Sequence, residues 1–578
     1  MARRRKMLYT DGVKGRSALK NGMEKNQKKT AETQGRTRKW DIPAFITGLW
    51  LTLMFTVFPL IYDDYYFNIL ETKFATLSVL TLGMFALLLL YGIFSGGVFR
   101  AAVRMHSDRK RMGFRCWFRQ LLSPTDLCVL AFFLFALIAT ANAYPYVQQA
   151  ITGEEGRYVG MFYIFLMTGA YLCVSRFLHF HRNYILLFLC TSWIVCLLGI
   201  TDFYNMNLLH FRDQMQETQY AMFSSTLGNI NTYTAYVGIV IALSGTLFVL
   251  SDEGAGRVLF YFATMIVSFM AMAMGESDNG YLTLAGFFGG LPFIAFRTRR
   301  GIRRYMLALA AFFTDLLYIG HVLRVKGDAV QEIHGLFQVI IGFRWLPLLA
   351  VGLWLLAMGM HWRKLRQKVE ESAPPVLIQR LWYLFFGLCV FSLLGLLLYA
   401  NSMSYDAAWQ KFGSLADYLK FRDAWGTQRG YVWRAGIDEY RSLSPLHKLT
   451  GTGPDTFGIY MMIHRWKEMT EATGQFFDAA HNEYIQYLFT VGPLGLLSHV
   501  GILVFAVREA FRKGRSLLGA ERIQLQKSAY YYALGLAMFC YALQAAVNIN
   551  IPIAAPLLWT MIMLAAGRNL QKVAQKKN

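Results

Sequence analysis

Charged residues are scarce in this chain of 578 residues: Asp, Glu, Lys and Arg together make up 16%, whereas 55% of the residues are hydrophobic. A water-soluble protein of this size cannot bury so much apolar surface, so the composition argues against a soluble enzyme. Long apolar runs instead indicate that a lipid bilayer is the solvent for much of the chain.

Cysteine and acidic residues are also few. The seven cysteines do not stand at metal-ligand spacing, which argues against a disulfide or zinc framework. Basic residues outnumber acidic ones by 58 to 35, giving a net charge of +23. The basic residues form short clusters between apolar runs, as the positive-inside rule describes, so we predict no nucleic-acid partner.

The apolar runs predict an all-α integral membrane protein with about 14 transmembrane helices. They lie near residues 43–62, 74–97, 125–145, 159–175, 184–200, 232–250, 258–274, 281–296, 305–320, 335–358, 381–400, 483–507, 529–547 and 553–567. The predicted organisation is a disordered basic tail at 1–40, helices within 41–400, a large loop at 401–482, the last three helices within 483–567 and a short tail at 568–578.

The basic clusters predict the orientation of the chain in the membrane. If the N-terminus is inside, most of the 58 Lys and Arg residues fall in inner loops such as RTRRGIRR and VREAFRKGR. Both termini are therefore predicted to be cytoplasmic. The loop at 401–482, which we expect to be partly helical, is then extracytoplasmic.

The loop at 401–482 carries most of the polar groups that chemistry would need in the second half of the chain. In RGYVWRAGIDEYRSL, helical spacing puts Arg434, Asp438 and Arg441 on one stripe. Either Asp438 pairs with one or both arginines, or Arg434 faces inward to bind an anion. A guanidinium suits diphosphate because its planar fork pairs two oxygens at once.

Two further motifs follow in the same loop. Gly451, Gly453 and Pro454 predict a tight turn, which either starts the next helix or cradles a phosphate with its backbone N–H groups. His481 and Asn482 stand where the chain re-enters the membrane, a place where a lone histidine is more often structural than catalytic.

Shorter polar segments precede apolar runs elsewhere in the chain. In ITGEEGRYVGM, Arg157 is either an interface anchor or a ligand. In STLGNINTYTAYVGI, Asn229 and Asn231 either cap a helix or contact a substrate. In MGESDNGYLTL, helix capping is a sufficient explanation for Glu276, Asp278 and Asn279.

GTGPDTF, followed by AHNEYIQYLFTVGPLGLL, resembles the signature of the O-antigen ligase and polysaccharide polymerase superfamily. That signature is a Gly-x-Gly turn, a His-Asn pair that opens a span, and Gly-x-x-Gly. EEGRYVGM and GNINTYTAYVG resemble further motifs of the family, in the expected order, and the resemblance covers about residues 120–567. Where the family often has Ser-Arg-Gly, this chain has SDNG at 277–280, so an expected positive charge is missing there.

The resemblance implies a GT-C-like, metal-independent inverting glycosyltransferase of the bacterial cytoplasmic membrane, with no cofactor. The donor would be a glycan on a polyprenyl diphosphate carrier, and the acceptor a glycan, a lipid or a protein. By the same resemblance His481 would be the general base or would orient the acceptor. The implied diphosphate ligands are Arg157, Arg434 and Arg429, and the implied supporting residues are Asn229, Asn231, Gly451, Gly453 and Asn482.

Two alternatives stay open at this point. A polymerase of lipid-linked repeat units shares the chemistry and differs in the acceptor. A transporter or flippase of lipid-linked glycan makes no bond, and such proteins place ionisable residues at mid-membrane. Here only Arg344 is predicted to stand inside an apolar run, while polar groups gather at the outer surface, which favours an enzyme.

Overall fold

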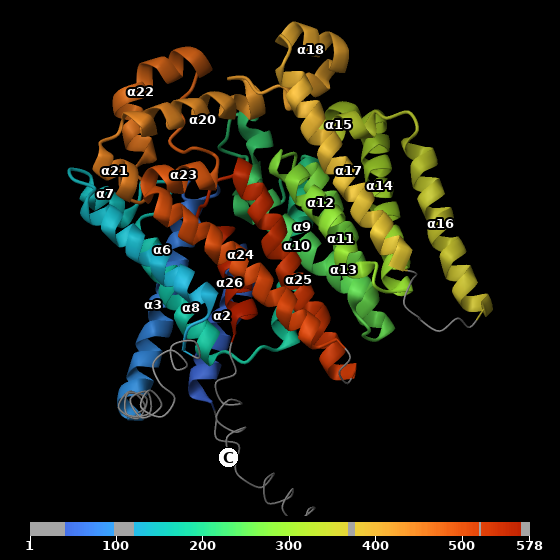
Figure 1. Cartoon of the computed structure of the whole chain (residues 1–578), viewed down its shortest axis with the longest axis horizontal. Helices are drawn as coiled ribbons and strands as arrows, with labels where there is room; N and C mark the ends of the chain where they lie inside the picture. Colours follow the sequence, from blue (N-terminus) through green and yellow to red (C-terminus); the bar gives the residue numbers. More distant parts are fainter. Residues whose placement is uncertain (1–40, 97–120, 368–375, 519–521, 568–578) are drawn as a thin grey trace, which may run out of the picture.

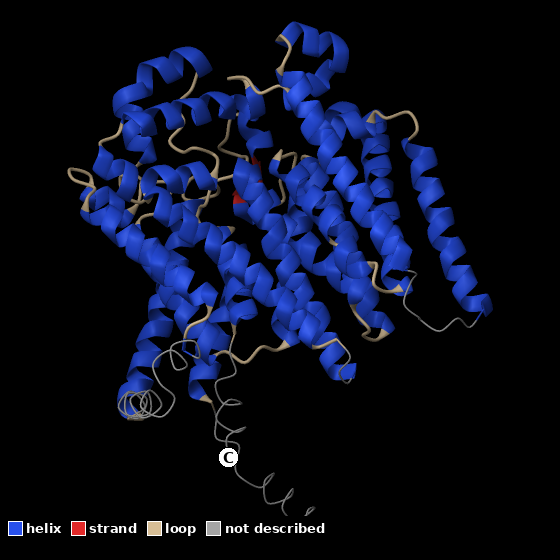
Figure 2. Ribbon diagram, viewed as in Figure 1, coloured by secondary structure: helices blue, strands red, loops and turns tan. Residues whose placement is uncertain are grey.

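The computed structural model describes residues 41–96, 121–367, 376–518 and 522–567. In these ranges the chain is almost entirely helical, and the long helices stand side by side in one bundle (Figures 1 and 2). One short antiparallel ladder pairs β1 (Phe223–Ser224) with β2 (Gly228–Asn229). The predicted all-α class is confirmed, and the predicted tails at 1–40 and 568–578 lie outside the described residues.

Ten helices of the described ranges are long and apolar enough to cross a membrane. They are α2 (Ile42–Leu60), α3 (Ile69–Phe94), α6 (Pro124–Ala141), α9 (Arg182–Phe203), α10 (Ile230–Leu250), α11 (Ala255–Met274), α14 (Arg299–Lys326), α17 (Val376–Asn401), α24 (Gly492–Ser516) and α25 (Arg522–Gln544). A pair bent by 77°, α15 (Gly335–Ile341) with α16 (Leu346–Gln367), makes an eleventh if both parts cross together.

Shorter helices cover the remaining predicted runs. They are α8 (Met161–Phe177), α12 (Asn279–Gly290) with α13 (Pro292–Ala295), and α26 (Ala555–Ala566). All 12 residues of α26 are buried, so neighbouring helices rather than lipid surround it. A helix in that position does not have to match the bilayer thickness. The described residues thus contain ten or eleven helices long enough to span, fewer than the predicted 14, and the span count stays a prediction.

Of the ten long helices, α10 is the most deeply buried, with 94% of an 18-residue window inside the protein. Its sequence is apolar around the whole circumference, as expected for a helix with protein on every side. It packs against α11, α12 and α25. The corresponding window of α17 has no buried residue, so that helix exposes its apolar side chains at the edge of the bundle.

Arg344, the one ionisable residue expected inside an apolar run, is exposed in the turn between α15 and α16, whereas other ionisable side chains lie inside the bundle, and both findings correct the sequence-based expectation. Lys73 of α3 is fully buried and donates to three carbonyl oxygens at the end of α2 (2.9, 3.2 and 2.9 Å). In α24, His499 lies 3.4 Å from buried Glu483, and Asp315 of α14 is also buried. Lys73 completes the end of a helix, which leaves backbone carbonyls without partners of their own.

Short helices of the segment 401–482 cover one end of the bundle, at the top of Figure 1. They are α18 (Tyr405–Phe412), α19 (Ala416–Leu419), α20 (Trp425–Ser442), α21 (Pro445–Thr450) and α22 (Phe457–Thr473), joined from earlier in the chain by α7 (Val147–Thr152). The segment has an apolar core of its own that includes Val432, Phe457 and Met461. We call this end of the bundle the cavity end, because residues of the segment line a cavity there.

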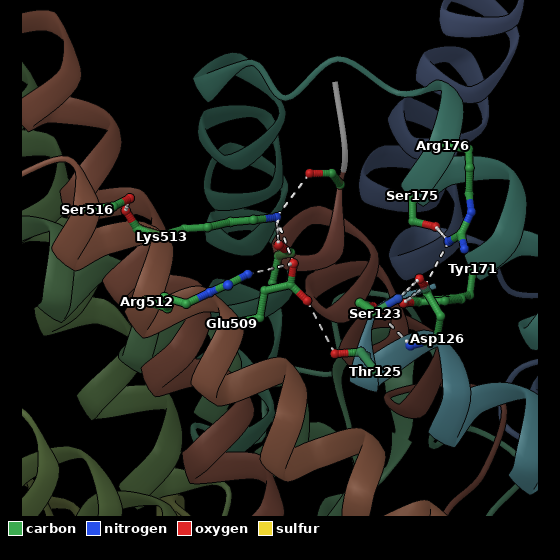
Figure 3. A network of polar contacts seen from close by, with 12 residues as sticks. Ser123, Thr125, Asp126, Tyr171, Ser175, Arg176, Glu509, Arg512, Lys513 and Ser516 are labelled. Carbon is green, nitrogen blue, oxygen red and sulfur yellow. Dashed lines mark hydrogen bonds and ion pairs between the residues drawn. The ribbon is translucent and has the colours of Figure 1, made fainter. Parts of the chain in front are cut away.

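A network of polar contacts ties helices together at the opposite end (Figure 3). Asp126 of α6 accepts from Tyr171 (2.6 Å) and Arg176 (2.9 Å) of α8. Glu509 of α24 pairs with Lys513 at 3.3 Å, and Lys513 also donates to the last carbonyls of α26. Since α24 starts at the cavity end, these groups stand roughly 30 Å from it along the helix axis.

Candidate active site

A cavity of about 680 Å³ lies beneath the short helices of segment 401–482. Its wall combines the start of α10, the α11–α12 and α14–α15 connections, the α19–α20 region and the segment before α23 (Glu483–Thr490). Its polar lining residues are Asn229, Asn231, Glu276, Ser277, Asp278, Tyr281, His334, Asp417, Tyr418, Arg422, Thr427, Arg429, Gln475, Asp478 and His481. Segments more than 200 residues apart in sequence therefore meet at one site.

The backbone around His481 is fixed on both sides. The carbonyl of Ala480 accepts from the Trp433 indole (2.9 Å), and its N–H donates to Gln486 (3.0 Å). Asn482 caps α23 by accepting from two N–H groups of its first turn (3.0 and 3.1 Å). His481 itself takes a left-handed conformation with φ 48°, which a non-glycine residue adopts only where its surroundings impose it.

The imidazole of His481 lines the cavity and is uncharged at neutral pH. Burial, together with the positive charges of Arg429 and Arg157, lowers the pKa of His481 to about 3. No hydrogen bond among the described residues engages its ring, and Phe477 packs against it edge-on, at 5.7 Å between ring centroids. A neutral imidazole can accept a proton, and an anion bound beside Arg429 would raise the pKa of His481 by offsetting the guanidinium charge.

Arg429 supplies a positive charge to the cavity wall. Its side chain is 8% exposed, and it donates to Asp278 (3.3 Å), to Asn231 (3.4 Å) and to the carbonyl of Gly426 (3.2 Å). The sequence SDNG at 277–280 lacks the positive charge that the family pattern has there. In the folded chain a guanidinium reaches this place from α20 instead.

Arg157 lies behind Asp478 and does not line this cavity. It is buried and makes a two-pronged ion pair with Asp478 (2.7 and 2.6 Å), which does line it. The loop that carries Arg157 is held by Asp455, which accepts from the N–H groups of Glu154 (2.8 Å) and Val159 (3.1 Å). Arg157 therefore acts on the cavity through the carboxylate of Asp478 and through its charge.

Arg434 is not brought to the cavity. Its guanidinium makes a two-pronged pair with Asp423 (3.0 and 2.6 Å), and its side chain is 45% exposed. Asp438 pairs with Arg441 at 3.2 Å, so the simpler of the two sequence interpretations holds for Arg441 alone. Arg434 prefers Asp423 because the turn before α20 brings that carboxylate beside it.

The glycine turn serves packing. Gly451 and Gly453 have φ of 82° and 112°, and a side chain at Gly453 would come within 2.7 Å of Ala143. The N–H groups of Thr452 and Gly453 donate to the last carbonyls of α23 (3.1 and 2.9 Å). Because these donors are used inside the fold and the turn does not line the cavity, the phosphate-cradle interpretation gains no support.

Sequence reasoning missed the acidic side of the cavity. The side chains of Glu276 and Asp278 make no capping bond to α12, although Asp278 is its N-cap residue: Glu276 accepts from the ring of His334 (2.6 Å), and Asp278 pairs with Arg429. The backbone is unusual at the cavity. The non-glycine residues Glu276, Thr427 and His481 all line it and all have positive φ (49°, 58° and 48°). Strained conformations of this kind gather at functional sites.

The two asparagines predicted as supporting residues both line the cavity. Asn229 caps α10 by accepting from the N–H of Asn231 (2.9 Å), so its capping interpretation is confirmed. The side-chain oxygen of Asn231 accepts from Ser277 (2.6 Å) and from Arg429. Asn231 thus joins the start of α10 to both the SDNG segment and α20.

The family comparison agrees with this picture. Residues 339–500, from α15 into α24, match the family described as O-antigen ligase. The matched stretch is 162 of the 578 residues, and over that stretch the chain is similar to the O-antigen ligase family. This confirms the resemblance seen in the sequence. The matched region holds Arg429, Asp478 and His481, whereas Arg157 and Asn231 lie outside it. No curated protein matches the chain.

Proposed function

We propose that this protein is a membrane glycosyltransferase of the O-antigen ligase type, which transfers a glycan from a polyprenyl diphosphate to an acceptor hydroxyl or amide. The observation that carries the proposal is the meeting of a neutral imidazole, His481, and a buried guanidinium, Arg429, in one cavity of the family domain. A base and a cation at one site are what the departure of a diphosphate from a sugar requires.

In the proposed reaction the acceptor oxygen attacks the anomeric carbon of the donor sugar. The attack comes from the face opposite the diphosphate, so the configuration inverts. The bond from that carbon to the diphosphate oxygen breaks, and its electron pair leaves with the diphosphate. His481 takes the proton of the hydroxyl and passes it to solvent through the cavity. Arg429 offsets the negative charge that builds on the leaving group, and the donor bond itself supplies the free energy.

Asp478 and Arg157 have a positioning role in this proposal. Asp478 stands three residues before His481, and the charge of its carboxylate raises the pKa of that histidine, against the larger effects of burial and the two arginines. The two-pronged bond to Arg157 fixes where that carboxylate lies.

The cavity end is proposed to face the extracytoplasmic side. Basic residues support this orientation because α14 begins with RRGIRR and α24 ends with REAFRKGR, both at the end opposite the cavity. A lipid-linked donor flipped across the membrane would then meet His481 at the outer leaflet.

The deciding experiment replaces His481 in the purified protein. His481→Asn removes the imidazole and keeps a residue that tolerates positive φ, whereas His481→Ala also disturbs the backbone. Both variants should lose glycan transfer from a polyprenyl diphosphate donor by a factor of about 100 or more. Unchanged turnover in His481→Asn would remove the base from the mechanism.

The products decide between the related activities. Transfer of one complete glycan to a distinct acceptor identifies a ligase. A ladder of repeat units on the same carrier identifies a polymerase instead. If the wild-type protein in vesicles moves the donor across the membrane and leaves its glycan bond intact, the protein is a transporter and the proposal is wrong.

A further inference from the structure

Two arginine–aspartate pairs at the site differ sharply in geometry. Arg157 grips Asp478 with two nitrogens, at 2.7 and 2.6 Å. Arg429 reaches Asp278 with one nitrogen only, at 3.3 Å. Two-pronged, short contacts of the first kind are the strong form of this ion pair, and a single long contact is the weak form.

The charge of Arg429 is compensated only in part. Its Nε atom is buried without a hydrogen-bond partner, although its side chain is only 8% exposed. Burial lowers the pKa of Arg429, and Asp278 offsets that effect incompletely. For Arg157 burial acts in the same direction, but Asp478, together with the charges of Asp455 and Glu154, outweighs it, and the pKa of Arg157 is raised. Arg429 therefore has capacity for another anion; Arg422, which also lines the cavity and has an unpartnered Nε, differs in holding its carboxylate Asp417 at 2.6 Å.

Asp278 is free to leave Arg429. The only side-chain contact of Asp278 among the described residues is this one long bond, and its side chain is 31% exposed where it lines the cavity. A carboxylate in that position can turn toward water at little cost. Asn231 and the Gly426 carbonyl would still hold the guanidinium in place.

We propose that Asp278 is a built-in competitor for the leaving diphosphate: it holds Arg429 in the empty cavity, yields to the donor, and returns to expel the product. This inference rests on the proposed function, since it takes the diphosphate as the anion that Arg429 binds. A buried guanidinium with no counter-ion would hold a diphosphate too tightly for turnover, and a weak internal carboxylate lowers that affinity.

The proposal fixes the sign of one effect. Asp278→Asn removes the competing charge and keeps the shape of the side chain, so diphosphate should bind more tightly, by about three- to tenfold. The KM for the donor should fall, and inhibition by polyprenyl diphosphate should strengthen, while kcat does not rise. A residue that merely stabilises the fold would give weaker binding or no change.

The experiment measures binding of inorganic diphosphate to the full chain in detergent by calorimetry, and then transfer kinetics. Asp438→Asn is the matched control, because it removes a carboxylate from an exposed pair with Arg441 outside the cavity wall. It should leave binding unchanged. In the double variant Arg429→Gln with Asp278→Asn, the tightening should disappear.

Each remaining result has a defined meaning. Diphosphate binding in Asp278→Asn that is equal to or weaker than in the wild-type protein overturns the proposal. The proposal is also overturned if neither the wild-type protein nor this variant binds diphosphate. Asp278→Ser, which removes the same charge, serves if the first variant does not fold. If neither variant folds, Asp278 is structural and the proposal is wrong. Absence of glycan transfer by the wild-type protein would instead sink the proposed function.

Discussion

The pair formed by Arg157 and Asp478 allows the sharpest quantitative prediction. Arg157 is 6% exposed and makes two charged hydrogen bonds to Asp478, whose side chain is 41% exposed. A hydrogen bond to a charged group contributes about 1.5–3 kcal/mol. Water reaches the Asp478 side of this pair, so the lower part of that range applies.

Arg157→Lys keeps the charge and loses one of the two bonds. We expect kcat/KM for glycan transfer to fall by roughly 10- to 30-fold, which corresponds to about 1.5–2 kcal/mol. Asp478→Asn should cost at least as much, because it removes the carboxylate that accepts both charged hydrogen bonds from the buried guanidinium. The double variant should keep a much higher kcat/KM than multiplying the two single losses predicts, with a coupling energy of about 1.5 kcal/mol or more.

The assay is a double-mutant cycle on protein in lipid nanodiscs, with initial rates measured from a polyprenyl diphosphate donor and thermal unfolding measured in parallel. Arg434 and Asp423 provide the matched control cycle, since they form a similar two-pronged pair that is exposed (45% and 54%) and outside the cavity wall. Control variants should change the rate by less than about twofold. Additive effects of Arg157→Lys and Asp478→Asn would refute the positioning role.

Three further predictions concern the pKa of His481, the packing of the glycine turn and the charge of Arg429. Because the pKa of His481 is lowered to about 3, protonation of this histidine should not reduce kcat/KM anywhere in the neutral pH range. Arg429→Gln removes a positive charge that lowers the pKa of His481, so in this variant the loss of activity at acid pH should begin at a higher pH. An unchanged pH profile would show that the charge of Arg429 does not act on His481. Gly453→Ala should lower the unfolding temperature, at a cost of about 1–3 kcal/mol, because it forces φ of 112° and a close approach to Ala143; full stability would contradict this packing. Chelators should leave the transfer rate unchanged because Arg429 supplies the positive charge, and loss of activity that Mg²⁺ restores would count against that role.

An integral membrane protein, helices along the apolar runs and the likeness to the O-antigen ligase family could all be predicted from the sequence alone. Apolar runs of about 20 residues can form little else in a bilayer, where every backbone group must find an internal partner. His481, Arg429, Asn229 and Asn231 were also found in the sequence, since motif residues stand out in polar segments between apolar runs. Each of these four lines the cavity.

Tertiary structure alone decided which charges meet. Arg434 is as prominent in the sequence as Arg429, yet an exposed partner takes it out of the site. Asp278 and Asp478 look like ordinary polar residues until α20 and the Arg157 loop bring guanidinium groups against them. Helical periodicity is local and can be read along the chain, whereas an ion pair between residues 150 or 300 positions apart depends on how whole helices pack.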